Sequence, residues 1–161
     1  MNARSRRTGL AFLLAAIAAA CVSPQAKLAA QQEKDPQYQY EKAVVCMQAG
    51  LHDEAIKYLN RSVFLDSNHY LSHNLFGLIY LIKRDFPKAQ ASLERCVALK
   101  PDFSEAHNNL GTVLQETGQP VQAEAAFKRA FEIDQNYNAS YNLAKIYFER
   151  GEFEPALRYI G

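Results

Sequence analysis

The feature that most constrains this chain is a spacing of 34 residues that recurs along most of its length. The spacing relates five sets of matching side chains: Ala55, Ala89 and Ala123; Asn74, Asn108 and Asn142; Gly77 and Gly111; His73 and His107; Phe103 and Tyr137. A period of roughly 20–50 residues is typical of arrays in which each unit buries its apolar face only against its neighbours. The spacing therefore predicts a stack of similar units rather than a single globular core.

Each unit carries the pattern of two amphipathic helices, because its apolar side chains recur at steps of three and four. Gly50, Gly118 and Gly151 follow helical runs, where a left-handed backbone is cheapest for glycine. No alternating run is long enough to predict a strand, so the fold class is all-α. We expect helix pairs at residues 37–49 with 53–65, 71–83 with 86–99, 105–117 with 120–133, and 138–150 with 153 onward.

The third unit matches a known repeat best, through His107, Leu110, Gly111, Leu114, Gly118, Ala123, Phe127 and Ala130. This set resembles the tetratricopeptide repeat (TPR) family. The resemblance implies an α-solenoid of antiparallel helix pairs coiled into a right-handed superhelix. It covers residues 36–161, with repeats at about 36–69, 70–103, 104–136 and an incomplete 137–161. The fourth repeat slips by one residue, which predicts a deletion between Asp134 and Tyr141.

Residues 1–20 have the features of a secretory signal peptide. Arg4, Arg6 and Arg7 precede the apolar run LAFLLAAIAAA at residues 10–20. This run is too short to span a bilayer as a helix, which needs roughly 20 apolar residues. The sequence therefore predicts a segment that is removed from the mature protein.

The residues that follow resemble the lipobox of bacterial lipoproteins, because small side chains at 18–20 precede Cys21. The resemblance implies that Cys21 is lipidated and that the lipid anchors the protein in a membrane. Val22 after the cysteine is similar to lipoproteins of the outer membrane, facing the periplasm. Residues 21–35 are expected to form a flexible or weakly helical tether. A cleaved signal without a lipid is the alternative.

In the TPR family, partners usually bind in the concave groove that the first helices line. Asparagine offers both donors and acceptors for a peptide backbone, and apolar neighbours accept its anchors. The alternative is that the leucines of repeat two are simply buried and that the asparagines are only solvated. The first helices also carry Ile82, Glu105 and Phe148, which the same resemblance places along the groove. Carried over to this chain, the groove comprises Tyr40, Val44, Leu71, Asn74, Leu78, Asn108, Asn109, Thr112, Tyr141, Asn142 and Lys145.

One kind of partner is disfavoured by the residues of repeat one. The carboxylate clamp of chaperone-binding relatives needs basic and asparagine side chains along the groove. Tyr40 and Val44 stand where its first basic residue and its first asparagine would be. We therefore do not expect the groove to bind acidic C-terminal tails.

The sequence predicts no catalytic residue, cofactor or metal site. Cys46 and Cys96 occupy core positions, where buried thiols are expected. His69 and His73 are four residues apart, but no other ligand completes a metal set, so packing is favoured. Nucleic-acid binding is not expected either, since Lys+Arg 18 and Asp+Glu 17 nearly cancel.

These observations together predict a non-enzymatic TPR lipoprotein that faces the periplasm. It would act as a scaffold or adaptor for a protein or peptide partner in type IV pilus, secretion or envelope assembly. In this it is similar to type IV pilus pilotins and outer-membrane assembly lipoproteins. The alternative is the repeat portion of a longer enzyme, or enzyme subunit, whose active domain lies beyond Gly161.

Overall fold

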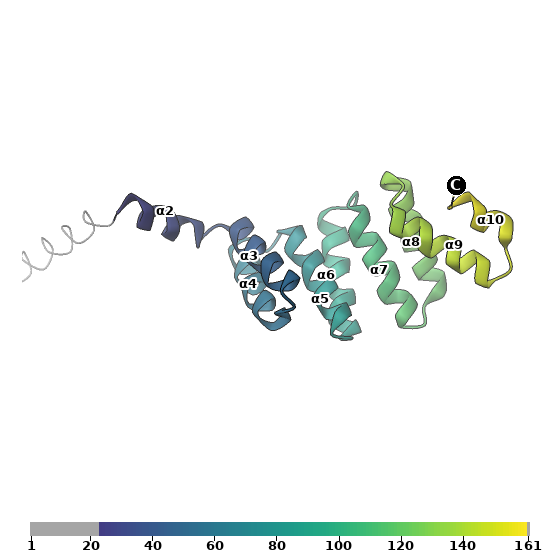
Figure 1. The fold of residues 1–161 in the computed structure, drawn as a ribbon, viewed down its shortest axis with the longest axis horizontal. Helices are drawn as coiled ribbons and strands as arrows, with labels where there is room; N and C mark the ends of the chain where they lie inside the picture. The colour runs from purple at the N-terminus through teal and green to yellow at the C-terminus, as the bar shows by residue number, and fades with distance from the viewer. Residues whose placement is uncertain (1–22, 161) are drawn as a thin grey trace, which may run out of the picture.

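The computed structural model describes residues 23–160, and in that range helices are joined by turns without any strand (Figure 1). From residue 36 onward, every helix begins and ends within one residue of its predicted range wherever a bound was predicted. The predicted signal segment at 1–20 and Cys21 lie outside the described residues. The helices are α2 (Pro24–Gln32), α3 (Pro36–Gln48), α4 (His52–Leu65), α5 (Tyr70–Ile82), α6 (Phe86–Leu99), α7 (Ser104–Glu116), α8 (Pro120–Asp134), α9 (Tyr137–Glu149) and α10 (Phe153–Arg158).

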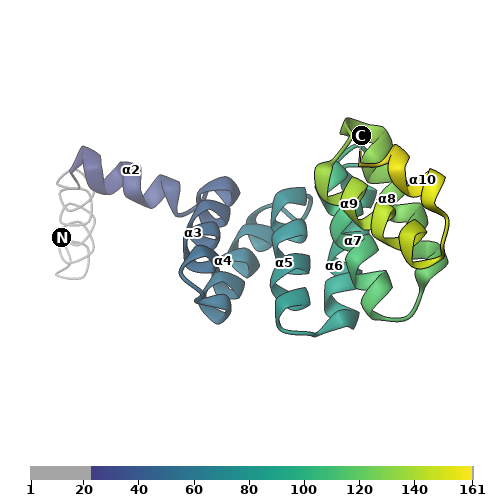
Figure 2. The ribbon, with the colours of Figure 1, turned by 45° about the vertical axis from the view of Figure 1, so that its right-hand side comes forward.

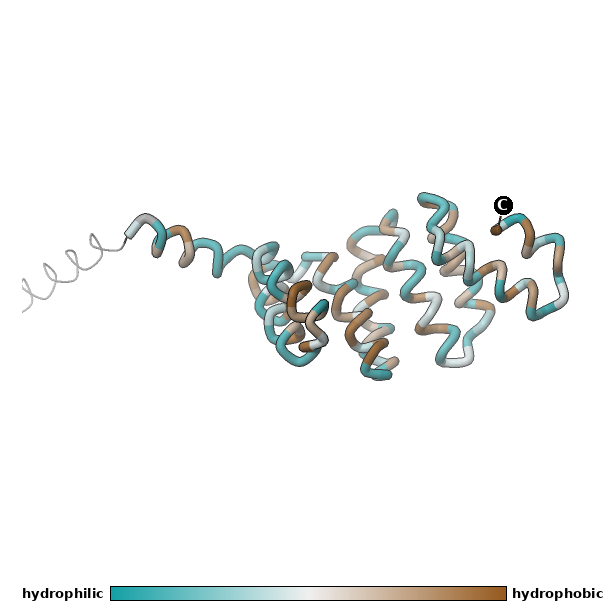
Figure 3. The backbone as a smooth tube through the Cα atoms, in the orientation of Figure 1, coloured by the Kyte–Doolittle hydropathy of each residue, from teal (hydrophilic) through white to brown (hydrophobic). Residues whose placement is uncertain are grey.

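The helices from α3 onward form antiparallel pairs: α3 with α4, α5 with α6, α7 with α8 and α9 with α10. Each second helix also packs against the first helix of the next pair, so the pairs follow one another in a row (Figures 1 and 2). Apolar residues are most concentrated in α5, in the middle of this row (Figure 3). The predicted all-α solenoid is confirmed.

The segment before the first pair contains a helix of its own. Ser23 caps α2 by accepting a hydrogen bond from the backbone N–H of Ala26 at 3.1 Å. The helix leads away from the row of pairs (Figure 1). Its far end is held to α3, because Gln39 Nε2 donates to both the backbone and side-chain oxygens of Glu33 at 2.9 Å. Most of the predicted tether is therefore helical in the structure.

Each first helix is followed by a residue with a left-handed backbone. Three of these are the expected glycines, Gly50, Gly118 and Gly151, with φ between 73° and 75°. The equivalent residue of repeat two is Arg84, with a φ of 58°. A side chain in this conformation costs roughly 1–2 kcal/mol relative to the ordinary backbone. The repeat spacing thus imposes the turn even where glycine is absent.

Close approach of the two helices in a repeat depends on glycine at two crossings. A Cβ atom on Gly77 would lie 2.4 Å from Cγ of Leu93, and one on Gly111 would lie 2.6 Å from Cε1 of Phe127. Both large side chains are fully buried. Glycine therefore makes room for a core side chain of the paired helix.

The connection between α8 and α9 is shorter than the other inter-repeat turns. It consists of Gln135, which has a φ of 55°, and Asn136, which caps α9 by accepting from the N–H of Ala139 at 3.0 Å. The earlier turns span residues 66–69 and 100–103. The slip of register in repeat four therefore arises here, between Asp134 and Tyr141 as expected.

A charged cluster joins α8 to α9. Glu124 accepts a hydrogen bond from the Tyr147 hydroxyl at 2.7 Å and contacts Arg150 Nη1 at 2.6 Å and Lys128 Nζ at 2.7 Å. Only 15% of its side chain is exposed. Lys128 first, then Tyr147 and Arg150, hold the pKa of Glu124 down to about 2. The carboxylate thus stays charged over almost the whole pH range and ties the last two repeats together.

Within residues 23–160, every helix is too short or too polar to cross a membrane.

Candidate partner-binding face

The predicted groove residues all lie on first helices. Nine of the eleven keep part of their side chain in solvent, whereas Asn74 and Asn108 are 6% and 7% exposed. We call these eleven residues, together with Glu105 on α7, the first-helix face. It consists of Tyr40 and Val44 on α3; Leu71, Asn74, Leu78 on α5; Glu105, Asn108, Asn109, Thr112 on α7; and Tyr141, Asn142, Lys145 on α9.

The asparagines of this face bind each other across the repeats. Asn109 Nδ2 donates to Asn74 Oδ1 at 3.1 Å, and Asn142 Nδ2 donates to Asn108 Oδ1 at 3.1 Å. Asn74 Nδ2 in turn donates to Glu105 Oε1 at 3.0 Å. Each of these amides thus has a partner on a neighbouring first helix, an arrangement that the sequence did not predict. Their first role is to bridge neighbouring first helices.

This bridging changes what asparagine substitutions would test. Replacing Asn108 and Asn109 with alanine removes one bridge on each side of α7. It also leaves Asn142 Nδ2 and Asn74 Oδ1 without these partners, at a cost of about 1 kcal/mol each, while Asn74 Nδ2 still donates to Glu105. Exposed side chains such as Tyr141, 63% exposed, are therefore the cleaner probes of binding.

The N-terminal half of the face is apolar. Tyr40, Val44 and Leu78 pack against the core formed by Ala43, Leu59 and their neighbours, while part of each side chain stays exposed. They are therefore not simply buried, and they offer an apolar surface beside the asparagine bridges.

A chain of hydrogen bonds runs from His69 into the first repeat. Ser62 Oγ donates to the backbone oxygen of Pro36 at 2.7 Å, and Ser72 Oγ donates to Ser62 Oγ at 2.8 Å. Because the Ser72 proton is used, its oxygen accepts from His69 Nδ1–H at 2.8 Å. Burial lowers the pKa of His69 below its usual range. His69 Nε2 lies 3.1 Å from Gln37 Oε1 on α3, so both nitrogens of the ring contact a polar side chain.

Two further histidines, His73 and His107, contact backbone oxygens of the turns between repeats. Nε2 of His73 lies 3.0 Å from the backbone oxygen of Ser67, and Nε2 of His107 lies 3.0 Å from that of Pro101. Across residues 23–160, no three His, Cys, Asp or Glu side chains are placed to hold a metal ion.

Both cysteines in the described range are free thiols. Cys96 is buried, and burial raises its pKa to about 12. Its thiol is therefore protonated at neutral pH and is a poor nucleophile.

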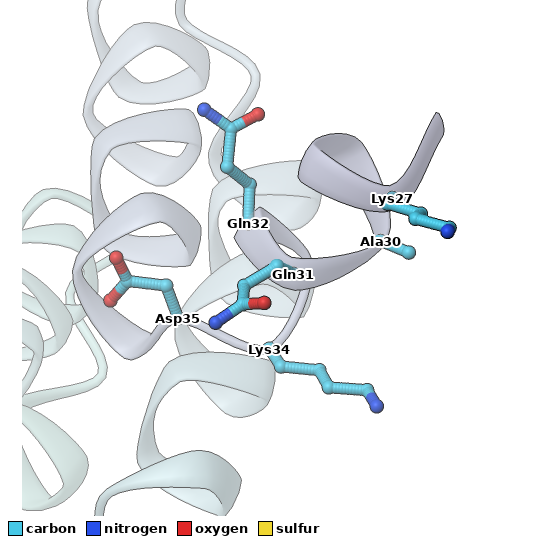
Figure 4. Close-up of a pocket in the computed structure, with 6 residues that line it drawn as sticks. All are labelled: Lys27, Ala30, Gln31, Gln32, Lys34 and Asp35. Atoms are coloured by element: carbon cyan, nitrogen blue, oxygen red, sulfur yellow. The ribbon is translucent and has the colours of Figure 1, made fainter. Parts of the chain in front are cut away.

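A hollow of about 650 Å³ lies where α2 approaches α3, away from the first-helix face (Figure 4). The side chains around it are exposed and point in several directions instead of converging on one point. Such an open surface lacks the convergent groups of a ligand site. Its lining residues are Lys27, Ala30, Gln31, Gln32, Lys34 and Asp35.

A second, mostly apolar hollow of about 370 Å³ lies at the other end of the row. It is lined by Tyr141, Ala144, Lys145, Phe148 and Ile160, from α9 and the end of the described chain. It is continuous with the first-helix face through Tyr141 and Lys145. The face therefore has an apolar region at each end and the asparagine bridges between them.

Two family models of the tetratricopeptide repeat match this chain, one over residues 80–137 and one over residues 14–69. Together they cover more than half of the chain. The second match begins upstream of the first predicted repeat, within the predicted signal segment.

Curated relatives match part of the chain. Human "Protein O-mannosyl-transferase TMTC3" is 32% identical over 87 residues, which are 53% of this chain and 9% of that protein. Anaphase-promoting complex subunit 3 of Schizosaccharomyces pombe is 27% identical over 62% of this chain and 15% of its own length. The Hsp70-Hsp90 organising protein of Plasmodium falciparum is 29% identical over 56% and 36%. The chain thus spans about a third or less of each relative.

Solved structures share the fold. The crystal structure of MamA superposes with a TM-score of 0.71 at 22% identity, over 83% of this chain and 78% of that one. The first TPR of Spaghetti (RPAP3), bound to the HSP90 peptide SRMEEVD, gives 0.70 at 20% identity, over 74% and 98%. The thermophilic TPR protein TTC0263 from Thermus thermophilus gives 0.67 at 20% identity, over 78% and 70%.

Proposed function

Because this chain belongs to the tetratricopeptide repeat family, we propose that it is a protein–protein interaction scaffold that binds its partner on the first-helix face. The observation that carries the proposal is the continuity of this face over four successive first helices. Bridges between asparagines hold the helices in place, while Tyr40, Val44 and Tyr141 remain exposed at least in part. A rigid, preformed surface loses little conformational freedom when it binds an extended segment.

A solved relative supports peptide binding. The first TPR of RPAP3 holds a seven-residue HSP90 peptide, and this chain covers 98% of that structure. An array of this length is therefore sufficient to hold a short peptide segment. The TPR fold is generally a non-catalytic interaction scaffold, and the similarity to TMTC3 over 9% of that protein carries no enzymatic activity over to this chain.

We further propose that the scaffold is anchored by a lipid on Cys21 and faces the periplasm from the outer membrane. The support is the sequence: a basic start, an apolar run, and small residues before the cysteine. In that location the protein would serve type IV pilus, secretion or envelope assembly. The helical segment after residue 23 would then separate the repeats from the membrane.

Site-specific photo-crosslinking of the full chain tests the binding face. A photoreactive amino acid is placed at Val44 or Tyr141 on the first-helix face, and in a matched variant at Phe64 on α4, which is 77% exposed. We expect partner adducts from the first two positions and none from Phe64. Equal adducts from all three positions, or adducts from Phe64 alone, would refute the proposed face.

Metabolic labelling and globomycin treatment test the anchor. Cells given radiolabelled palmitate should label the wild-type protein and not the Cys21→Ser variant, and globomycin should make a larger, uncleaved precursor accumulate. If the protein takes up no label and globomycin leaves its size unchanged, the lipid anchor is wrong, while the binding face is tested separately by the crosslinking.

A further inference from the structure

We propose that the first-helix face selects an extended segment that carries a lysine or arginine next to an apolar residue, and that Glu105 binds the cation. This inference rests on the proposed scaffold function and names the chemistry of its partner. It follows from the charge at the middle of the face and from the apolar surface on the neighbouring first helices.

Glu105 is an exposed carboxylate without an ionic partner in the described part of the chain. It lies in the first turn of α7, and Asn74 Nδ2 donates to its Oε1 at 3.0 Å. None of the ion pairs within residues 23–160 includes it. The hydrogen bond from the Asn74 side-chain amide fixes one oxygen of the Glu105 carboxylate in place, so the negative charge is held at a defined point on the face.

The first helices around Glu105 provide no competing cation. Helix α5 contains neither Lys nor Arg, and α7 contains only acids among its charged residues. The one lysine of α3, Lys42, is 3.0 Å from Glu33 and lies over the rings of Tyr38 and Tyr58. Lys145 on α9 lies 3.9 Å from Glu149, so none of the lysines on the four first helices pairs with Glu105.

Tyr40 on α3 lies within the field of this carboxylate. Burial raises the pKa of Tyr40, and the negative charge of Glu105 raises it further. A guanidinium or ammonium group bound to Glu105 would gain a charge-assisted hydrogen bond from the carboxylate. Arginine suits this contact, because its planar group donates to a carboxylate through two N–H groups.

The apolar surface beside this point favours an apolar neighbour in the partner. Val44, Leu78 and Ile82 lie on α3 and α5, and each keeps part of its side chain in solvent. Covering such a surface is favourable by about 25 cal/mol per Å². The partner segment is therefore expected to carry a basic residue directly beside an apolar one.

The same charge argues against acidic peptides. The peptide held by RPAP3, SRMEEVD, has two glutamates and an aspartate near its end. On this face such a segment would bring its carboxylates near Glu105, which is unfavourable at short range. This agrees with Tyr40 and Val44 standing at positions where an anion-binding clamp needs polar groups.

Fluorescence anisotropy with three labelled peptides tests the selection. The probes are GSLRLSG, GSLQLSG and GSLELSG, which differ only in their central residue. Against the full chain without its signal segment, we expect the arginine peptide to bind about tenfold more tightly than the glutamine peptide at low salt. The glutamate peptide should bind most weakly, and added salt should reduce the difference.

Charge variants assign the selection to one residue. Glu105→Gln should abolish the preference for arginine, and Glu105→Lys should reverse it toward the glutamate peptide. Glu94→Lys is the matched control, because it makes the same change in net charge on α6, at an exposed position outside the face. This control should keep the preference for arginine.

The outcomes separate this inference from the scaffold function. Equal affinity for the three peptides, or a preference that survives Glu105→Gln, overturns the inference and leaves the binding face intact. A failure of all three peptides to bind also overturns it, and the crosslinking pattern from Val44, Tyr141 and Phe64 then decides on the scaffold function alone.

Discussion

The cluster around Glu124 makes a quantitative prediction about stability. We consider Glu124→Gln, which keeps the size of the side chain and an oxygen that accepts from the Tyr147 hydroxyl. The substitution removes the charge that faces Lys128 at 2.7 Å and Arg150 at 2.6 Å. It therefore isolates the electrostatic part of the contact between α8 and α9.

The magnitude follows from the pKa of Glu124, about 2 in the folded protein against an ordinary 4.5. At about 1.4 kcal/mol per pH unit, this difference gives an upper limit of roughly 3.5 kcal/mol in the free energy of unfolding. Lys128 and Arg150 are 43% and 39% exposed, so solvent screens part of it. We expect a loss of about 1–2 kcal/mol at neutral pH.

The sign of the pH dependence is fixed by the direction of the pKa change. Because the folded protein holds the pKa of Glu124 below its unfolded value, the stabilisation is complete above about pH 4.5. It is lost as the pH falls from there to about 2. The difference between the wild-type protein and Glu124→Gln should therefore shrink over this range.

Urea unfolding followed by far-UV circular dichroism measures the effect at neutral and acid pH. Glu132→Gln is the control, because Glu132 is 62% exposed and lies 3.5 Å from Arg129 on the same helix. It should change the free energy of unfolding by less than about 0.5 kcal/mol. The reasoning is refuted if Glu124→Gln costs no more than this control at neutral pH, or if its cost is the same near pH 2.

Four further substitutions test other parts of the fold. Gly111→Ala places a Cβ 2.6 Å from the Phe127 ring and should cost about 1–3 kcal/mol; an unaltered melting curve would contradict the helix crossing. Arg84→Gly should raise the free energy of unfolding by about 0.5–1 kcal/mol, because Arg84 has a left-handed backbone. Gly118→Ala should lower it by about 1 kcal/mol for the same reason, since the space around Gly118 is open and only the backbone conformation opposes a side chain. Because burial lowers the pKa of His69, stability should fall as the pH drops below the ordinary 6.5 toward that lowered value, and His69→Gln should remove this dependence in the same urea titrations.

The helix boundaries were predictable because they depend on local signals that the repeat multiplies. Glycines at 50, 118 and 151 mark turns, and the spacing carries the turn to Arg84 where no glycine marks it. The slip in repeat four was visible in the same way, because Gly151 follows Gly118 by 33 residues instead of 34.

The contacts that join repeats were not predictable from the sequence. The bond from Asn142 to Asn108 needs the distance between α9 and α7, which is set by packing of the whole stack. The same holds for Tyr147 and Glu124, which are 23 residues apart and outside the repeat period. The sequence placed the asparagines on the right helices and missed that they bind each other. It also gave Glu105 no special weight, because only the absence of a nearby cation makes it stand out.

The asparagine bridges have a mechanical consequence. A stack of helix pairs bends by widening or narrowing the gaps between successive first helices, since each pair contacts only its neighbours. Asn109 to Asn74 and Asn142 to Asn108 span two such gaps with single hydrogen bonds near 3.1 Å. Each bond opposes widening of the gap that it spans, so bending that opens this side of the array must break a hydrogen bond between two asparagines.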